Sequence, residues 1–285
     1  MKVLLRLLPV ALVLVARPAG GDVQFSMEEI TNYLDVFKSS YKSRKAPEED
    51  AISVIENLMK AYRYLESKGE EETRDEKRLR KRILDSLARG LKVRNRPQVT
   101  TECARALGDL GDKSSAKALF SWLDRSVLKE KSPNPQFLEV GFYALAYVGP
   151  KDKKSLDTML GWAMSGKHPD IGVANQALAA IPQWRLLPGP FRKEMFKKIM
   201  LDLGGVHSKS RQKGGQSRTY KERYERIKDN GLRALWHLAG EKKTFRDPAA
   251  ATAWWNANKK AKWEDYRGPK FRPKDEAKKS QPAGR

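Results

Sequence analysis

The chain has 285 residues and a formal net charge of +22, because 57 lysines and arginines outnumber 35 aspartates and glutamates. Such a basic balance favours anionic partners and disfavours chemistry that needs clustered carboxylates, such as calcium binding. The single cysteine, Cys103, excludes an intramolecular disulfide framework, so the fold must depend on an apolar core. We expect this thiol to be buried, because Cys103 shares an apolar helical stripe with Val99 and Leu107.

The N-terminal 21 residues have the pattern of a secretory signal peptide. Lys2 and Arg6 precede a short apolar run, 7–15, and small residues end the segment at Gly21. A membrane span needs about 20 apolar residues, roughly twice the length of this run. We therefore predict cleavage after Gly21, with an uncleaved anchor as the alternative. Cleavage would remove Lys2, Arg6 and Arg17, lower the net charge from +22 to +19, and place the protein in the periplasm or outside the cell.

Residues 22–96 predict an N-terminal helical extension. Apolar residues at helical spacing indicate a first helix around Met27, and Pro47 with three following acids marks the start of a second. Gly69 ends that helix, and a third is expected from Glu70 to Leu91. Its basic cluster provides candidate anion-binding residues, with a solvated helix face as the alternative. These residues are Arg78, Lys81 and Arg82.

From Pro97 onward the chain repeats one helical pattern. Ala-Leu pairs close successive apolar runs at 106–107, 144–145, 177–178 and 234–235. Recurrence of a helix–turn–helix unit every roughly 30–47 residues is typical of an α-solenoid, so we predict an all-α fold. The expected helix pairs are 97–110 with 113–128, 134–148 with 151–165, and 169–181 with 188–203, followed by a long helix at 219–239 and a capping helix at 247–262. The solenoid would span 97–267, and the composition of 268–285 predicts a disordered tail.

Parts of this region resemble a known family. His168-Pro169-Asp170 followed by Ala177-Leu178 resembles the first helix of HEAT-like repeats of the phycobilisome-lyase type, and Arg105–Asp112 resembles the end of that repeat. Ala174 departs from the pattern, which usually has arginine there. The segment 247–255 is similar to the end of exported HEAT-repeat proteins of planctomycete-like bacteria. The resemblance implies an α-solenoid of HEAT-like helical hairpins and is nearly silent about function.

The segment 204–218 has an unusual composition. It contains two Gly-Gly pairs, four basic residues and no acid, and we predict a loop without regular structure. A long loop inside a compact array is often functional. We expect either a basic arm that contacts phosphate, sulfate or carboxylate groups, or a solvated insertion between helices. The candidate anion-binding residues here are Lys209, Arg211, Lys213 and Arg218.

Tryptophans gather near the C-terminal end, and the candidate surface aromatics are Trp236, Trp254 and Trp255. We expect the helix 247–262 to cap the open end of the array, with an aromatic platform for glycans or peptides as the alternative. The three histidines lie far apart without companions at ligand spacing, and no nucleophile or phosphate-loop motif is visible. We therefore predict no metal site, no cofactor and no catalytic residues.

These features favour an exported, non-catalytic scaffold that binds a protein or peptide. Its basic charge predicts added affinity for an anionic partner such as a glycan, a lipid head group or a nucleic acid. The alternative is a nucleic-acid-binding or DNA-glycosylase-like HEAT-repeat protein, which would share the fold and the basic charge. The signal sequence disfavours that alternative, because its substrate would be cytoplasmic. A bilin-lyase-like enzyme is suggested by the fold resemblance alone.

We expect the protein purified from its native host to begin at Asp22, which mass spectrometry of the N-terminal peptide would show. Leu12→Arg should block this processing, because a charge interrupts the apolar run. An intact N-terminus on a cytoplasmic protein would contradict export and favour the nucleic-acid alternative.

Overall fold

The computed structural model describes residues 24–42, 46–93, 95–149, 153–181, 188–214, 216–240 and 245–263. These residues form eleven α-helices and no strand, so the prediction of an all-α fold is confirmed. The predicted signal peptide, 1–21, and the predicted tail, 268–285, lie outside the described residues. The helices are α1 (Met27–Lys42), α2 (Glu48–Ser67), α3 (Arg74–Gly90), α4 (Pro97–Leu110), α5 (Ala116–Trp122), α6 (Pro135–Val148), α7 (Lys153–Ala163), α8 (Ile171–Ala180), α9 (Gly189–Ser210), α10 (Ser217–Ala239) and α11 (Pro248–Asn258).

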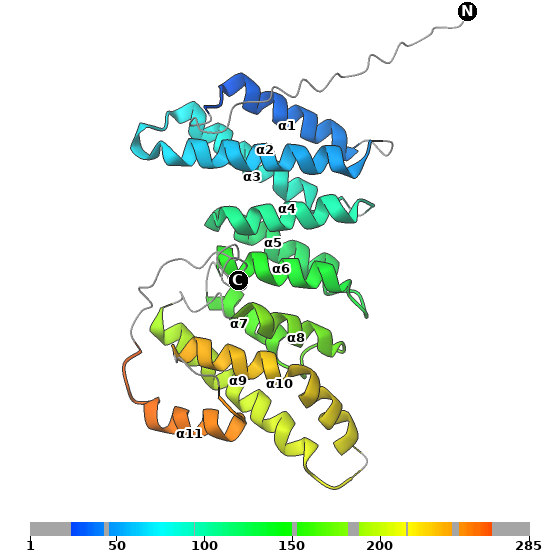
Figure 1. Cartoon of the computed structure of the whole chain (residues 1–285), viewed down its shortest axis with the longest axis vertical. Helices are drawn as coiled ribbons and strands as arrows, with labels where there is room; N and C mark the ends of the chain where they lie inside the picture. Colours follow the sequence, from blue (N-terminus) through cyan, green and yellow to red (C-terminus); the bar gives the residue numbers. More distant parts are fainter. Residues whose placement is uncertain are drawn as a thin grey trace, which may run out of the picture.

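The helices stack one after another along the long axis of the molecule (Figure 1). The even-numbered helices form a row, in which α2 packs on α4, α4 on α6, α6 on α8, and α8 on α10. The odd-numbered helices α3, α5, α7 and α9 each pack against the next even-numbered helix. At one end α1 contacts α2 and α3, and at the other end α11 contacts α9 and α10. One continuous apolar cluster runs through the stack.

Small residues allow α4 and α6 of the even-numbered row to approach closely. A Cβ at Gly108 of α4 would lie 2.6 Å from the Cα of Ala144 in α6, so the two backbones approach closely there. The leucines beside these small residues fill the space between layers: Leu107 is 0 % exposed and Leu145 is 1 % exposed. The repeated Ala-Leu pattern therefore marks the contact between successive helices.

Several predicted helix boundaries differ from the structure. The helix expected at 113–128 is divided into α5 and a π-helical segment, Leu123–Val127. The last helix begins after Asp247 as predicted, with the Asp247 carboxylate accepting the Ala250 N–H at 2.8 Å, but it ends at Asn258 rather than at 262. The predicted start of α3 at Glu70 is also wrong, because Gly69–Glu71 forms a 3-10 turn.

A capping box fixes the start of α3. The Thr73 hydroxyl accepts the Glu76 N–H at 3.3 Å, and the Glu76 carboxylate accepts the Thr73 N–H at 2.8 Å. Lys68 also donates to Glu76. The hydrogen bond from Lys68, followed by the one from Thr73, lowers the pKa of Glu76 to about 2. Lys68 and the Thr73 N–H thus bind the ionised carboxylate of Glu76 and stabilise the start of α3.

We expect Leu107→Ala and Leu145→Ala each to lower the free energy of unfolding by about 2–5 kcal/mol, because each leaves a cavity between helices. Denaturant titration followed by circular dichroism measures the loss. Leu201→Ala is the matched control, since Leu201 of α9 is 59 % exposed, and its effect should stay below about 0.5 kcal/mol. An unchanged free energy of unfolding in both core variants would show that the predicted repeat register is wrong.

Thr73→Ala should cost about 0.5–2 kcal/mol near neutral pH, because α3 loses its cap. The contribution of Glu76 depends on pH. Its folded pKa of about 2 lies below the ordinary 4.5, so this stabilisation is present above about pH 4.5 and is lost as the pH falls toward 2. Glu76→Gln should therefore reduce the drop in urea midpoint between neutral pH and about pH 3. An equal drop in the parent protein and in this variant would refute the role of the carboxylate.

Candidate functional site

The three histidines lie apart, and each has a local partner. The Asp170 N–H donates to His168 Nδ1 at 3.0 Å, so Nε2 carries the proton and donates to the Leu128 carbonyl at 3.2 Å. The described part of the chain holds no group of three or more His, Cys, Asp or Glu side chains that could bind a metal. The two other ring pairs are His207 with Tyr224, at 4.6 Å between centroids, and Trp236 with His237, at 3.9 Å.

Cys103 is fully buried in α4, as predicted. Burial, and secondarily the charge of Glu102, raises the pKa of the thiol. Gly90 of α3 packs so tightly against it that a Cβ there would collide with Sγ. A neutral, enclosed thiol is a poor nucleophile, so we assign Cys103 to the core.

The segment predicted as a loop, 204–218, is the tip of a helical hairpin, and that prediction is wrong. α9 continues through Gly204 and Gly205 to Ser210, and α10 begins at Ser217. The connection between them is short, and all of it except Gly215 is described. In Figure 1 this hairpin extends away from the rest of the stack.

Tertiary packing explains why the helix persists through two glycines. Leu203 and Val206 are buried and continue the stripe that Ile199 begins. Gly231 of α10 makes room for Leu203, because a Cβ at Gly231 would lie 3.1 Å from the Leu203 side chain. The apolar contact between α9 and α10 outweighs the low helix propensity of glycine. The helical spacing of these apolar residues was the sequence signal that pointed to this extension.

The hairpin tip carries an excess of positive charge. We define the basic tip as Lys209, Arg211, Lys213 and Arg218, all of which are exposed. Between Asp202 and Glu222 the sequence has five basic residues and no acid. Lys209 Nζ lies 5.0 Å from the ring centroid of Tyr220, and Arg218 donates to Glu222 at 3.3 Å. Within the described residues, no carboxylate pairs with Arg211 or Lys213, so these two side chains present their charges to solvent.

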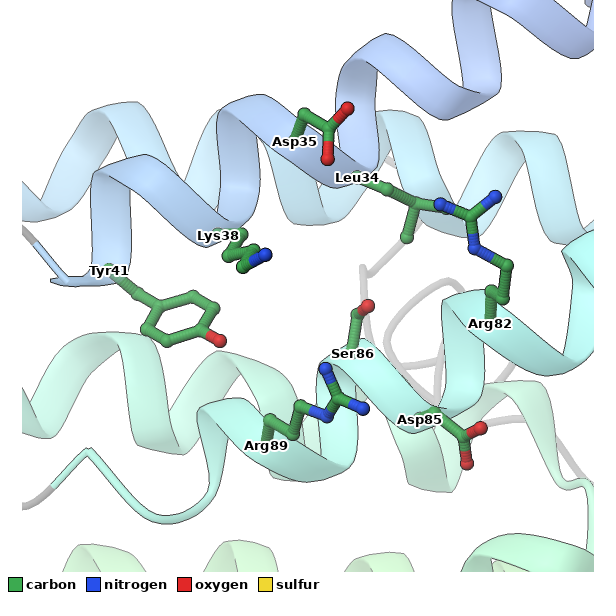
Figure 2. Close-up of a pocket in the computed structure, with 8 residues that line it drawn as sticks. All are labelled: Leu34, Asp35, Lys38, Tyr41, Arg82, Asp85, Ser86 and Arg89. Carbon is green, nitrogen blue, oxygen red and sulfur yellow. The ribbon is translucent and has the colours of Figure 1, made fainter.

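The second predicted group lies on α3, and all three of its residues are exposed. Arg78 pairs with Asp75 at 3.2 Å and faces solvent, and Lys81 is exposed. Arg82 also lines a groove between α1 and α3 (Figure 2). α3 and the basic tip lie at opposite ends of the stack (Figure 1), so the structure does not bring the two predicted basic groups together.

The late tryptophans pack around Phe196 of α9. The Phe196 ring lies 5.1 Å from Trp254 and 5.7 Å from Trp255, and Trp263 joins the cluster 5.5 Å from Trp254. Both α11 tryptophans are half-buried in this arrangement. The contacts give them a packing role at the end of the stack, whereas Trp236 lies on α10 beside His237.

The even-numbered row also carries half-buried polar and aromatic side chains that the sequence analysis did not identify. Tyr143 and Tyr147 of α6 pair at 4.6 Å, and burial followed by a hydrogen bond with Tyr147 raises the pKa of Tyr143. Asn230 of α10 donates to Asn175 of α8 at 2.9 Å. All four are half-buried and come from three adjacent helices of the row.

No family model, no curated protein and no solved structure matches this chain. Among the described residues, no helix has the length and apolar character that a membrane crossing requires.

Proposed function

We propose that this chain is an exported, non-catalytic scaffold, built as an α-solenoid of HEAT-like helical hairpins with α1–α3 as an N-terminal extension and α11 as a cap. The order of helix contacts supports the proposal, because each even-numbered helix packs on the next one and on an odd-numbered neighbour, as stacked hairpins do. The resemblance of 168–178 and 105–112 to HEAT-like repeats of the phycobilisome-lyase type supports the same repeat unit.

The exposed side of the even-numbered row supports binding of a protein or peptide. The paired rings of Tyr143 and Tyr147 are half-buried on α6. The hydrogen-bonded amides of Asn175 and Asn230 are half-buried on α8 and α10, the helices that follow α6 in the row. Aromatic and amide groups suit an interface because they combine contact area with hydrogen bonding. A row of helices presents such groups over an extended surface.

The proposed affinity for an anionic partner rests on the basic tip. Its four cations are exposed at the end of a projecting hairpin, and the chain around them contains no acid between Asp202 and Glu222. Solvent-exposed cations attract a polyanion at long range and contribute little to the fold. Sulfated or phosphorylated polymers are therefore the ligand class that this tip suits.

A nucleic acid is the alternative anionic partner, because its phosphates would meet the same cations. Tyr220 lies beneath Lys209 and is the aromatic residue nearest to the tip. One half-buried ring offers little surface for base stacking. Export also disfavours this alternative, so we favour an anionic glycan.

Replacing Lys209, Arg211, Lys213 and Arg218 together with Gln should weaken heparin binding about tenfold or more and lower the dependence of binding on salt. With duplex DNA as the probe, the slope of log K against log salt should fall by about 0.9 for each phosphate that a removed cation had neutralised. Helicity and Tm should stay nearly unchanged, because all four side chains are exposed.

The matched control removes the same charge from the exposed face of α3, with Arg74, Lys77, Arg78 and Lys81 all changed to Gln. This variant should keep most of the heparin affinity. An equal decrease of affinity in both variants would show that dispersed charge, not the basic tip, binds the polyanion. Tighter binding of duplex DNA than of heparin at one salt concentration would favour the nucleic-acid alternative.

A further inference from the structure

A small groove separates α1 from α3 at the N-terminal end of the stack, far from the basic tip (Figures 1 and 2). Its volume is about 140 Å³, well below the several hundred Å³ typical of a site for a cofactor or a drug-sized ligand. The residues that line it are Leu34, Asp35, Lys38, Tyr41, Arg82, Asp85, Ser86 and Arg89.

Cations and hydroxyl groups face each other across this groove. Figure 2 shows Lys38 of α1 and Arg89 of α3 pointing into the gap between the helices, with the hydroxyls of Tyr41 and Ser86 beside them. Arg82 lies at the far side, next to Leu34. Leu34 is buried, so the groove has an apolar wall behind these polar groups.

Among the described residues, no carboxylate lies at ion-pair distance from the cations of the groove. Within the described residues, neither Asp35 nor Asp85 forms a salt bridge with Lys38, Arg82 or Arg89, and no hydrogen bond joins the Tyr41 or Ser86 hydroxyl to another side chain. The Asp85 carboxylate points away from the gap in Figure 2. The helix dipole favours Arg89 in the last turn of α3, but it does not explain why Lys38 faces the same gap.

Lys38, Arg89 and the two hydroxyls supply several donors to the gap, and the Asp35 carboxylate lies on its α1 side. A guanidinium presents paired N–H groups that match two oxygens of a phosphate or sulfate, and an ammonium adds a point charge. The two hydroxyls can donate to further oxygens. Because Asp35 and Asp85 stand at the rim, three cations and two carboxylates leave a net charge of +1 around the groove. That net charge suits one small anionic group better than a polyanion.

We infer that the α1–α3 groove binds a single tetrahedral oxyanion, a phosphate or sulfate group, through Lys38, Arg89 and the hydroxyls of Tyr41 and Ser86, with Arg82 contributing charge. The group could be a free anion or the end of a larger phosphomonoester. This site is separate from the basic tip and does not depend on the proposed function.

The test measures binding of inorganic phosphate to the full chain by isothermal titration calorimetry at constant ionic strength, with chloride as the reference salt. The parent protein should bind phosphate saturably. Arg89→Gln should weaken that affinity about tenfold, since it removes one charge-assisted contact. Asp85→Asn should have the opposite effect and tighten binding, because it removes a repelling carboxylate from the rim.

Lys81→Gln is the matched control, since Lys81 is exposed on the same helix and does not line the groove. It removes the same charge as Arg89→Gln and should leave the affinity for phosphate unchanged. The fourfold Gln variant of the basic tip should also bind phosphate normally. Circular dichroism and Tm without phosphate establish that each variant is folded.

A second arm separates the two sources of the oxyanion. Vesicles of phosphatidylcholine containing phosphatidic acid are compared with pure phosphatidylcholine vesicles. If the phosphatidic acid vesicles retain the parent protein but not Arg89→Gln, the groove binds a phosphomonoester end group. If the protein binds phosphate but not these vesicles, the groove binds a free anion. Absence of saturable phosphate binding, or equal weakening by Lys81→Gln and Arg89→Gln, would overturn the inference.

Discussion

The close packing of successive helices along the even-numbered row is the constraint on which the rest of the structure depends. Each helix buries an apolar stripe that it cannot cover alone, so it needs a neighbour on both sides. Gly108 against Ala144 allows the backbones of α4 and α6 to approach, and Leu107 and Leu145 fill the remaining space. The order of the helices in the stack and the separation of its two ends follow from this contact.

The two ends of the stack need additional contacts, because a terminal helix has a neighbour on one side only. At the N-terminal end, the buried Arg96 donates to the carbonyls of Ser40 and Ala46 and so fastens the end of α1. At the C-terminal end, the buried Arg192 donates to the Leu238 carbonyl at 2.7 Å, and the tryptophans of α11 cover Phe196. Each end thus combines a buried arginine with apolar cover, which satisfies backbone acceptors while excluding water.

The packing of the helices determines where the basic residues lie. A helix that packs on one side leaves its other side to solvent, and in this chain that side is rich in lysine and arginine. At the tip of the projecting α9–α10 hairpin, exposed cations outnumber acids. Between α1 and α3, cations face one another across a groove. The first arrangement suits an extended anionic surface, and the second suits one small anionic group. The two surfaces lie too far apart to form one site (Figure 1).

The sequence alone determined that the chain is helical, because apolar spacing and the start signals at Pro47 and Pro97 are local properties. It also predicted the burial of Cys103. The continuation of α9 through Gly204 and Gly205 was decided by tertiary structure, since contact with α10 outweighs the propensity of those glycines. Tertiary structure alone likewise placed Arg82 in a groove with α1 and packed two tryptophans onto Phe196, because the neighbour that a helix face meets depends on residues distant in the chain.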